Sequence, residues 1–322
     1  MSRSFLPVSG FELPRFAGVP TFMRLPHVQL AEPDLTEVAV GFVGVPWDGG
    51  TTNRPGARHG PRALRDASTM IRQFHPVTGL NPFEAVNCAD LGDVAVNPAD
   101  VMDTLQRVTA FYEKVVAAGI RPFTAGGDHL VSLPVLRAVA KGQPLGMIHF
   151  DAHTDFYNEY FGGFRYTHGT PFRRAVEEGL LDPKKIVQIG IRGTGYDTED
   201  IDFALANGVR LIRIEELFER GVNEVMAEAR DIVGQDPAYV SFDIDGIDPS
   251  FAPGTGTPEI GGFNTFEAQQ LCRGLSGVNI AACDLVEVSP PFDPSGMTAW
   301  VGVSIMFELL CPLAESVAAK AA

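Results

Sequence analysis

The stretch that decides the fold runs from Leu145 to Asp155 and reads LGMIHFDAHTD. Its first six residues are nearly continuous in hydrophobicity, as a strand that is covered on both faces must be. In its last five residues, Asp151, His153 and Asp155 occupy alternate positions. A chain that is still extended there points these three side chains the same way. The stretch therefore predicts a buried strand that carries acids and a histidine to one edge of a sheet.

Seven more segments share this apolar, β-branched character. Together with the first, the expected strands are Glu37–Val45, Val86–Leu91, Arg121–Ala125, Leu145–Phe150, Lys185–Ile191, Val209–Ile214, Ala238–Phe242 and Asn279–Val286. Segments with helical patterning separate them, at Arg62–Gln73, Ala99–Ala118, Val131–Ala140, Pro171–Glu178, Thr198–Asn207, Asn223–Val233, Thr265–Leu275 and Met297–Ala314. This alternation predicts an α/β fold in which a mostly parallel sheet carries helices on both faces.

The length and composition favour one globular unit. The chain has 322 residues, of which 45% are hydrophobic and 20% are charged. An α/β fold of this size is often a single domain, and no repeat, low-complexity tract or linker divides the sequence. We therefore expect one domain over residues 1–322. Residues 1–35 are rich in Pro and Phe and are interpreted as an N-terminal arm that lies over the body or over a neighbouring subunit.

The charge and the cysteines limit the partners and the compartment. The formal net charge is −15, which argues against nucleic acid or an anionic membrane as a partner. The N-terminus lacks the apolar core of a secretory signal, and no apolar run reaches the roughly 18 residues that a membrane helix needs. The four cysteines lie far apart, at Cys88, Cys272, Cys283 and Cys311. They are interpreted as reduced, buried thiols, and we expect a cytoplasmic protein.

Polar groups follow several expected strands at the point where each strand ends. The segment Gly126–His129 follows the third strand, and its glycines are interpreted as residues that let the backbone turn tightly before His129. Asp243 and Asp245 follow the seventh strand, and Asp284 and Glu287 end the eighth. Ligands of parallel α/β sheets bind beyond the carboxyl ends of the strands. These groups are therefore expected at one edge of the sheet, together with those that follow Phe150.

Four carboxylates and two imidazoles at one edge need positive charge beside them, because they would otherwise repel one another. The six candidate ligands are His129, Asp151, His153, Asp155, Asp243 and Asp245. Two divalent cations cancel four aspartates in formal charge. Oxygen and imidazole ligands without a thiolate favour Mn²⁺, with Ni²⁺, Co²⁺ or Fe²⁺ as alternatives. A centre with two such ions generates hydroxide at neutral pH and stabilises an oxyanion, so hydrolysis is its natural use.

The remaining histidines that could compete for this role are interpreted as cap or turn residues. They are His27, His59, His75 and His149.

The motifs GGDH, DAHTD and SFDIDGIDPSFAPGTGTPE occur here in this order and are spread over most of the chain. With GVPWDGGTTNRPGARHGPR, YTHGTPFRRAVEEGLLDP and CDLVEVSPPFD, they resemble the ureohydrolase (arginase/agmatinase) family. The resemblance is strongest to its bacterial branch acting on guanidino acids, the guanidinopropionases and guanidinobutyrases, with agmatinase and proclavaminate amidinohydrolase nearby.

The resemblance implies a three-layer αβα sandwich around a mostly parallel sheet of eight strands. It also implies hydrolysis of a guanidino group to urea and an amine, two Mn²⁺ per subunit, and a hexameric or trimeric homo-oligomer. In the family pattern, one ion is held by His129 and Asp155, the other by His153 and Asp245, and both by the bridging Asp151 and Asp243.

The resemblance also assigns roles in catalysis. The family's mobile-proton histidine falls on His168, and its guanidinium-binding glutamate falls on Glu287. Asp155 is expected to accept a hydrogen bond from the attacking hydroxide and to relay its proton. A histidine has the pKa range needed to protonate a leaving amine. A carboxylate is the planar anion that a guanidinium binds with paired hydrogen bonds.

One departure from the arginase pattern bears on the substrate. In arginases an asparagine stands two residues after the last aspartate of DAHTD and helps to hold the α-amino acid end. Here that position is Tyr157, followed by Asn158, and both are taken as candidate substrate-binding residues. The change favours a guanidino acid, 3-guanidinopropionate or 4-guanidinobutyrate, over arginine. Besides Tyr157, donors for its carboxylate could be Arg54, Arg58, Arg72, Arg165 or Arg192.

Several alternatives stay open at this stage. Agmatine would need an acid for its amine, for which Glu159 and Asp197 are candidates. A nickel-dependent hydrolase of guanidine or substituted guanidines would keep the chemistry and change the metal and substrate. A metal-dependent deacetylase or amidase would not be expected to carry the second aspartate pair and Glu287. A non-catalytic relative would be expected to have lost some of the six ligands.

Overall fold

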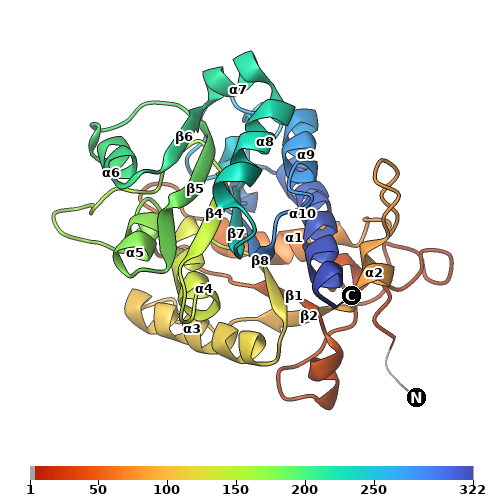
Figure 1. The fold of residues 1–322 in the computed structure, drawn as a ribbon. Coiled ribbons are helices and arrows are strands. Elements are labelled where there is room, and N and C mark those ends of the chain that lie inside the picture. Colours follow the sequence, from red (N-terminus) through yellow and green to blue (C-terminus); the bar gives the residue numbers. More distant parts are fainter. Residues whose placement is uncertain (1–3, 322) are drawn as a thin grey trace.

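The sheet has eight strands, and every neighbouring pair in it is parallel. The structure is a computed structural model, and it describes residues 4–321. The strands are β1 Val40–Gly44, β2 Cys88–Asp93, β3 Arg121–Ala125, β4 Leu145–Phe150, β5 Leu181–Ile191, β6 Arg210–Arg213, β7 Ala238–Asp243 and β8 Ile280–Val286. Their order across the sheet is β2-β1-β3-β8-β7-β4-β5-β6 (Figure 1). The predicted number of strands and their parallel direction are thus confirmed.

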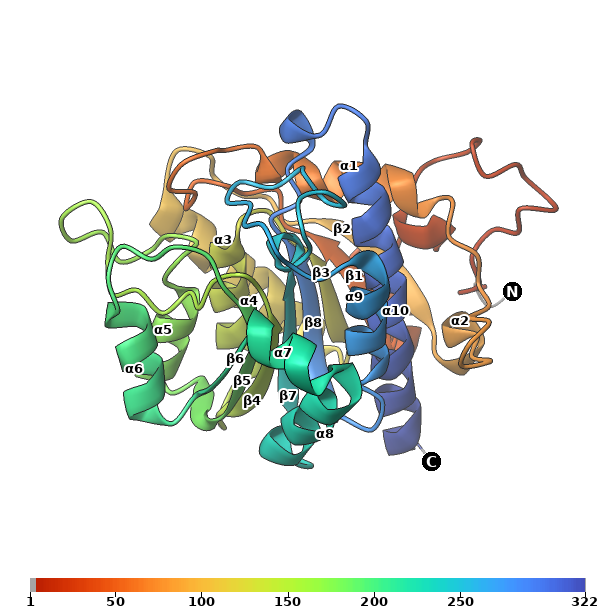
Figure 2. The same cartoon turned by 90° about the horizontal axis from the view of Figure 1, so that it is seen from above.

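Helices cover both faces of the sheet, which gives the predicted three layers (Figure 2). The α-helices are α1 Gly60–Ser68, α2 Pro82–Ala85, α3 Val101–Ala117, α4 Ser132–Val139, α5 Pro171–Glu177, α6 Glu199–Asn207, α7 Ile214–Arg220, α8 Val222–Val233, α9 Thr265–Arg273 and α10 Met297–Ala321. Short 3₁₀ helices are η1 Phe22–Arg24, η2 Pro33–Glu37, η3 Ala57–His59, η4 His129–Val131, η5 Ile244–Gly246 and η6 Pro290–Phe292. Helices α3 to α6 pack on one face, and α1 and α7 to α10 pack on the other.

One apolar core lies on each side of the sheet. One contains side chains of α8, α9 and α10, such as Val225, Leu271 and Leu309. The other contains side chains of α3 and α4, such as Val108 and Leu133. Because both faces are covered, the strands alternate very little between apolar and polar residues, as the sequence indicates.

The strand order brings the polar motifs together. Strands β3, β8, β7 and β4 are consecutive neighbours in the middle of the sheet. His129 follows β3, Glu287 follows β8, Asp243 ends β7, and Asp151 follows β4. Since all four strands are parallel, their carboxyl ends meet at one edge, where ligands bind in sheets of this kind.

Some elements differ from the sequence prediction. Helix α1 ends at Ser68 rather than at Gln73. At this end Ser68 Oγ donates to the carbonyl of Arg65 (2.8 Å) and accepts the N–H of Met23 (2.7 Å). The short helices α2 and α7 were not expected. Helix α7 follows β6 directly, so its first residue, Ile214, looks like the end of a strand in the sequence.

The last helix corrects one expectation. The segment Met297–Lys320 is long and apolar enough to cross a membrane, with a mean hydropathy of 1.6, but 72% of its most apolar window is buried in the fold. It packs on α1, α9 and β8. Glu308 interrupts the apolar run in the sequence; inside the protein it forms an ion pair with Arg273 and contacts His75 Nε2 (3.0 Å). The helix is therefore a core element of this fold.

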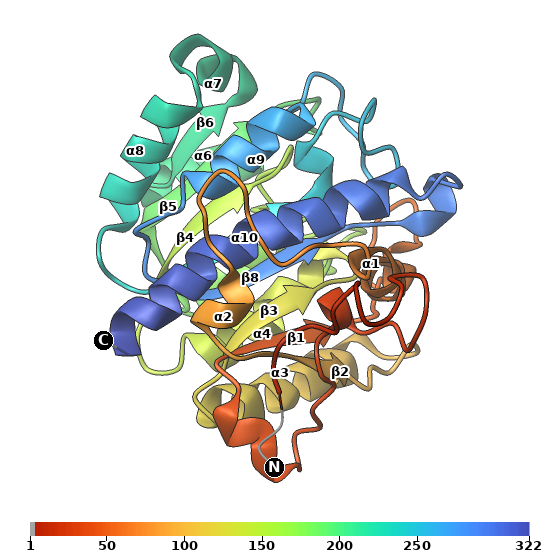
Figure 3. The same cartoon turned by 90° about the vertical axis from the view of Figure 1, so that its right-hand side faces the viewer.

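The N-terminal segment lies beside β1, β2 and α1 (Figure 3). Its second half is anchored, because Phe22 and Met23 are buried and the N–H of Phe22 donates to Asp90 Oδ2 (2.9 Å). Its first half leaves Phe11 and Phe16 almost fully exposed.

Candidate active site

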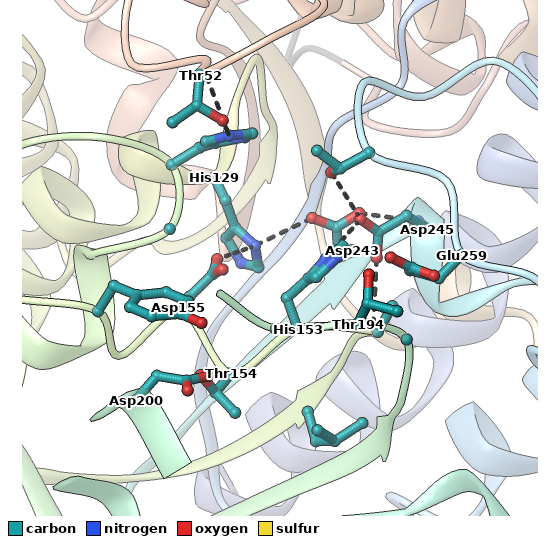
Figure 4. Close-up of a pocket in the computed structure, with 18 of the residues that line it drawn as sticks. Thr52, His129, His153, Thr154, Asp155, Thr194, Asp200, Asp243, Asp245 and Glu259 are labelled. Atoms are coloured by element: carbon teal, nitrogen blue, oxygen red, sulfur yellow. Dashed lines mark hydrogen bonds and ion pairs between the residues drawn. The ribbon is translucent and has the colours of Figure 1, made fainter. Parts of the chain in front are cut away.

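A cavity of about 640 Å³ opens at the carboxyl edge of the sheet. Most of the predicted site residues line it, namely His129, His153, Asp155, Tyr157, His168, Asp243, Asp245 and Glu287. Asp151 lies below the cavity and is fully buried. Figure 4 shows five of the lining residues directed toward one region of the cavity, namely His129, His153, Asp155, Asp243 and Asp245. Residues far apart in the sequence thus form one site.

The first cluster of possible ligands surrounds His129. Its Nδ1 atom lies 2.9 Å from Asp155 Oδ2, 3.1 Å from Asp243 Oδ2 and 3.2 Å from Asp151 Oδ2. This buried nitrogen makes no hydrogen bond within residues 4–321. Ligands about 2.1 Å from one octahedral cation are about 3 Å from each other. The spacing of these four atoms therefore fits a shared divalent ion.

The second cluster surrounds His153. Its Nδ1 atom lies 3.1 Å from Asp245 Oδ2 and 3.4 Å from Asp151 Oδ1. Asp151, His153 and Asp245 each offer an atom within 4.8 Å of the others. Asp151 thus presents Oδ2 to the first cluster and Oδ1 to the second, so one carboxylate lies between the two groups.

The charges of the two clusters are unbalanced without cations. Burial raises the pKa of Asp243 and Asp245, and the neighbouring aspartates raise it further. Burial alone would lower the pKa of His129 and His153, but the surrounding carboxylates outweigh it and raise the pKa well above its ordinary range. Without cations, protons on these histidines and aspartates offset the negative charge of the clusters. Oxygen and imidazole ligands of this kind suit divalent ions of the Mn²⁺ type, so the residues present fit a pair of such ions.

His149 lies next to the first cluster but is held differently. Its Nε2 atom is 2.8 Å from Asp151 Oδ2, and it could be counted among the ligands on distance alone. However, Gln188 Nε2 donates to His149 Nδ1 (2.8 Å) and to the carbonyl of Thr154 (2.6 Å). In a neutral ring the proton is then on Nε2, facing Asp151. His149 is therefore a buried strand residue that contacts Asp151, not the cap or turn residue expected from the sequence.

Glu287 and His168 form a buried pair above the clusters. Glu287 Oε1 accepts the backbone N–H of His129 (2.9 Å) and contacts His168 Nδ1 (2.9 Å). The buried Oε2 atom of Glu287 has no hydrogen-bond partner in the described part of the chain. Glu287 lines the cavity, so this oxygen is an unused acceptor at the site.

The far side of the His168 ring faces the loop after β1. The N–H of Thr52 donates to His168 Nε2 (3.1 Å), and Thr52 Oγ1 lies 2.8 Å from the same nitrogen. Burial would lower the pKa of His168, but the charge and hydrogen bond of Glu287 outweigh it and raise the pKa to about 9. His168 is consequently a proton donor at neutral pH that lies against the cavity.

The backbone is strained at two of these residues. Asp155 has φ +56° and Glu287 has φ +62°, values in the left-handed region that residues other than glycine seldom adopt. Such conformations cost of the order of 1–3 kcal/mol and concentrate at functional sites. The fold thus holds Asp155 and Glu287, whose side chains line the cavity, in backbone conformations that cost free energy.

Gly127 has a different role from the one expected. It is not among the glycines with positive φ, so a tight turn is not its reason. A Cβ atom at this position would lie 1.6 Å from the carbonyl oxygen of Trp47. Glycine is needed because the loop after β1 passes directly over the start of the His129 segment, and the N–H of Asp128 donates to Trp47 O (2.8 Å).

The residues proposed for the substrate tail are only partly brought together. Tyr157 lines the cavity, and its hydroxyl accepts the N–H of Tyr196 (3.2 Å). Asn158 is not in the cavity lining, and its side chain and carbonyl accept hydrogen bonds from Arg174 (both 3.0 Å). Arg213 also lines the cavity, and no motif in the sequence points to it, because it comes from the end of the edge strand β6.

The arginines considered as donors for the substrate carboxylate do not all lie in the cavity. Arg54 and Arg192 line the cavity, whereas Arg58 pairs with Asp48 and Arg165 pairs with Glu177. Arg72 is not part of the lining. Arg192 donates to five backbone carbonyls, including those of Asp245 and Glu259 (both 2.7 Å), so its guanidinium is already used. Arg54 contacts the ring of Phe292 (3.8 Å) and has no ion pair with a described residue.

The parallel αβα sandwich, with two clusters of carboxylates and imidazoles beyond its strands, places the protein in the class of α/β folds that have a candidate metal site at the carboxyl ends of the strands. A sequence model of the arginase family matches residues 38–311. The chain belongs to the arginase family.

Named relatives make the comparison more specific. The chain is 58% identical to a guanidinopropionase of Pseudomonas aeruginosa over 98% of both chains. It is 47% identical to a guanidinobutyrase of the same species, over 95% of this chain and 96% of the other. The solved structure of proclavaminate amidinohydrolase from Streptomyces clavuligerus superposes with a TM-score of 0.89 at 41% identity, and the match covers 94% of this chain and 99% of that one.

Proposed function

We propose that this protein hydrolyses the guanidino group of a small guanidino acid, 3-guanidinopropionate or 4-guanidinobutyrate, to urea and an amino acid. The observation that carries the proposal is Glu287 Oε2, a buried carboxylate oxygen without a partner in residues 4–321 that lies in the cavity beside His168 and the two clusters. A planar guanidinium is the cation that such an acceptor suits. The similarity to a guanidinopropionase over nearly the whole chain supports the substrate class.

We also propose that the two clusters hold two Mn²⁺ ions, with Ni²⁺ as the alternative. His129 and Asp155 would bind one ion, His153 and Asp245 the other, and Asp151 and Asp243 would contact both. When bound, two such ions activate water for attack and stabilise negative charge on oxygen. The position of Asp151, with one oxygen toward each cluster, supports this division.

The residues of the chain then have separate tasks. Glu287 binds and orients the guanidinium through its free oxygen. Asp155 lies at the cavity floor, where its carboxylate can hold the attacking water by a hydrogen bond and take its proton. His168 is protonated at neutral pH and donates a proton to the amine as the carbon–nitrogen bond breaks. The N–H of Thr52 donates to Nε2 of the neutral ring. When Nε2 is protonated it donates instead, and Thr52 Oγ1, 2.8 Å away, is its acceptor.

The tail of the substrate needs a donor for its carboxylate. Arg54 is the candidate that the contacts favour, since its guanidinium rests on Phe292 and has no described acidic partner. Tyr157 lines the same cavity and would limit the length of the tail. Arg192 is a positioning residue for the loops, because backbone carbonyls already use its donors.

An agmatinase is the second candidate function. The observation that favours it is the acidic character of one side of the cavity, where Asp197 and Glu259 belong to the lining. Either carboxylate could bind the primary amine of agmatine. Glu159, the other acid considered for this role, is not in the lining.

For the whole molecule we propose one cytoplasmic domain that forms a homo-oligomer, a hexamer or a trimer. The exposed side chains of Phe11, Phe16 and Trp300 support association of subunits, since large exposed apolar groups are usually covered in an assembly. The net charge of −15 supports a small-molecule partner over nucleic acid.

A panel of urea-release assays tests the substrate and the metal together. The purified protein is loaded separately with Mn²⁺ or Ni²⁺ and given 3-guanidinopropionate, 4-guanidinobutyrate, agmatine, arginine and guanidine. We expect urea from the two guanidino acids with Mn²⁺. Preference for agmatine would support the second candidate, and no urea from any substrate would contradict the catalytic proposal.

A further inference from the structure

A buried carboxylate lies behind the site, outside the cavity. Asp284 is in the middle of β8 and is fully buried. Its Oδ1 atom accepts the hydroxyl of Ser241 (2.6 Å), and its Oδ2 atom accepts those of Ser132 (2.6 Å) and Tyr239 (2.5 Å). Among the described residues no lysine or arginine pairs with it. A buried charge held only by three hydroxyls is costly, so its presence calls for a reason.

The hydrogen bonds fix the direction of donation. A carboxylate can only accept, and a serine hydroxyl has a single proton. The proton of Ser241 is used on Asp284, so Ser241 Oγ must accept from its other neighbour, His129 Nε2, at 2.8 Å. The proton of a neutral His129 ring is therefore on Nε2, and the lone pair is on Nδ1.

The lone pair of His129 Nδ1 faces the carboxylates of the first cluster, where a metal ligand is needed. His129 Nδ1 is the nitrogen that lies about 3 Å from the oxygens of Asp151, Asp155 and Asp243. Ser241 and Asp284 are paired partners on the neighbouring strands β7 and β8. The strand register thus sets the position of the acceptor, and the acceptor sets the orientation of the ring.

We propose that Asp284 is a positioning residue of the metal centre, which acts through Ser241 to hold His129 as an Nδ1 ligand. The inference rests on the proposed function, because it requires that the first cluster binds a divalent ion. Histidines that bind metals usually donate their second ring N–H to a carboxylate or another acceptor, and loss of that acceptor typically weakens metal binding about 10- to 100-fold. Here a serine hydroxyl is inserted between the two groups.

A matched pair of variants separates positioning from packing. Ser241→Ala removes the only acceptor of His129 Nε2 among the described residues, whereas Ser132→Ala removes one donor to Asp284 and leaves the path to His129 intact. Both serines are fully buried, and both variants lose one hydroxyl. Asp284→Asn tests the carboxylate itself, and Ser241→Thr restores a hydroxyl at the same position.

The experiment measures Mn²⁺ binding by equilibrium dialysis and the electron paramagnetic resonance of the bound ions, with thermal unfolding of each metal-free protein. In Ser241→Ala and Asp284→Asn we expect one of the two ions to bind about 10- to 100-fold more weakly, so that the signal of a single Mn²⁺ replaces that of a coupled pair. Ser132→Ala and Ser241→Thr should bind both ions within about threefold of the wild type.

Two results would overturn the inference while the wild type binds two ions and releases urea. One is unchanged binding of both ions in Ser241→Ala. The other is an equal loss in Ser132→Ala, accompanied by the same fall in metal-free stability, which would make the network a packing feature. A wild-type protein that binds no Mn²⁺ would instead contradict the proposed function, and the inference with it.

Discussion

Replacing Glu287 by glutamine tests the guanidinium site with little change of shape. Glu287 Oε1 accepts the N–H of His129 and contacts His168, each at 2.9 Å, while Oε2 is free. In Glu287→Gln the amide oxygen is expected to stay where Oε1 is, because the N–H of His129 needs an acceptor. The amide NH₂ group then occupies the position of Oε2 and faces the guanidinium with donors against donors.

The loss can be estimated from the bonds that disappear. A hydrogen bond to a charged group contributes about 1.5–3 kcal/mol, and an unsatisfied buried donor adds about 1 kcal/mol or more. A total of about 2.5–4 kcal/mol corresponds to a decrease of about 60- to 700-fold in kcat/KM, since about 1.4 kcal/mol is a factor of ten. The ligands of the two clusters are unchanged, so metal content should stay that of the wild type.

The assay is urea release from 3-guanidinopropionate over a range of concentrations, with metal content measured on the same samples. Glu259→Gln is the matched control, because it neutralises another carboxylate of the cavity lining that is not expected to contact a guanidinium. It should keep kcat/KM within a few-fold of the wild type. A Glu287→Gln enzyme with normal metal content and wild-type kcat/KM would refute the assignment of Glu287.

Five further outcomes are expected. Asp243→Ala, which removes an oxygen 3.1 Å from His129 Nδ1, should lose bound metal and urea release together by metal analysis and assay; full metal content would contradict the ligand assignment. His168→Asn should keep its metal and lose about 10²- to 10⁴-fold in kcat. The raised pKa of His168, about 9 against 6.5, favours the protonated form in the folded state, so its contribution to stability is complete below pH 6.5 and is lost as the pH rises through about 9. In the metal-loaded enzyme the nearby cations lower the pKa of His168 from about 9, so wild-type kcat should fall with rising pH at or below that value, and a flat profile up to pH 10 would exclude His168 as the donor. Removing one ion that is present at 100 times its Kd should cost about 2.7 kcal/mol, which is roughly 4 °C in Tm for a chain of 322 residues by calorimetry; an unchanged Tm would contradict a bound metal. Phe172→Ala, which removes the ring against His129 and His149, should cost about 3–5 kcal/mol in denaturant unfolding, and a loss below 1 kcal/mol would show that the site does not depend on this packing.

The central strands could be predicted from the sequence because burial on both faces leaves a strong local signal. Arg121–Ala125 and Leu145–Phe150 have the predicted bounds, and the six candidate ligands follow strands that are neighbours in the sheet. The positions of these side chains just after parallel strands predicted that they meet at one edge. The expectation of an extended chain there is wrong, because the backbone bends at Ala152 and His153, Asp155 has φ +56°, and Asp245 lies in η5. Local pattern and global fold agree most closely where the chain is most buried.

Other features depend on contacts that no local pattern contains. No local pattern predicts the contact between Ser241 and His129. It depends on the sheet, in which the register of β7 and β8 sets Ser241 opposite Asp284. The position of Asn158 outside the cavity depends on its bonds to Arg174, 16 residues further along. The sequence pattern indicates a cap or turn residue at His149, yet it lies in β4, and Gln188 on the neighbouring strand decides which of its nitrogens faces Asp151.

The central claim is that two divalent ions and the residues around them make one hydrolytic site. The most direct test is a titration of metal-free protein with Mn²⁺, in which bound metal and urea release from 3-guanidinopropionate are measured in the same samples. We predict that binding saturates at two ions per chain and that urea release rises with metal occupancy. Full urea release by the metal-free protein, or saturation with no urea released, would contradict the account.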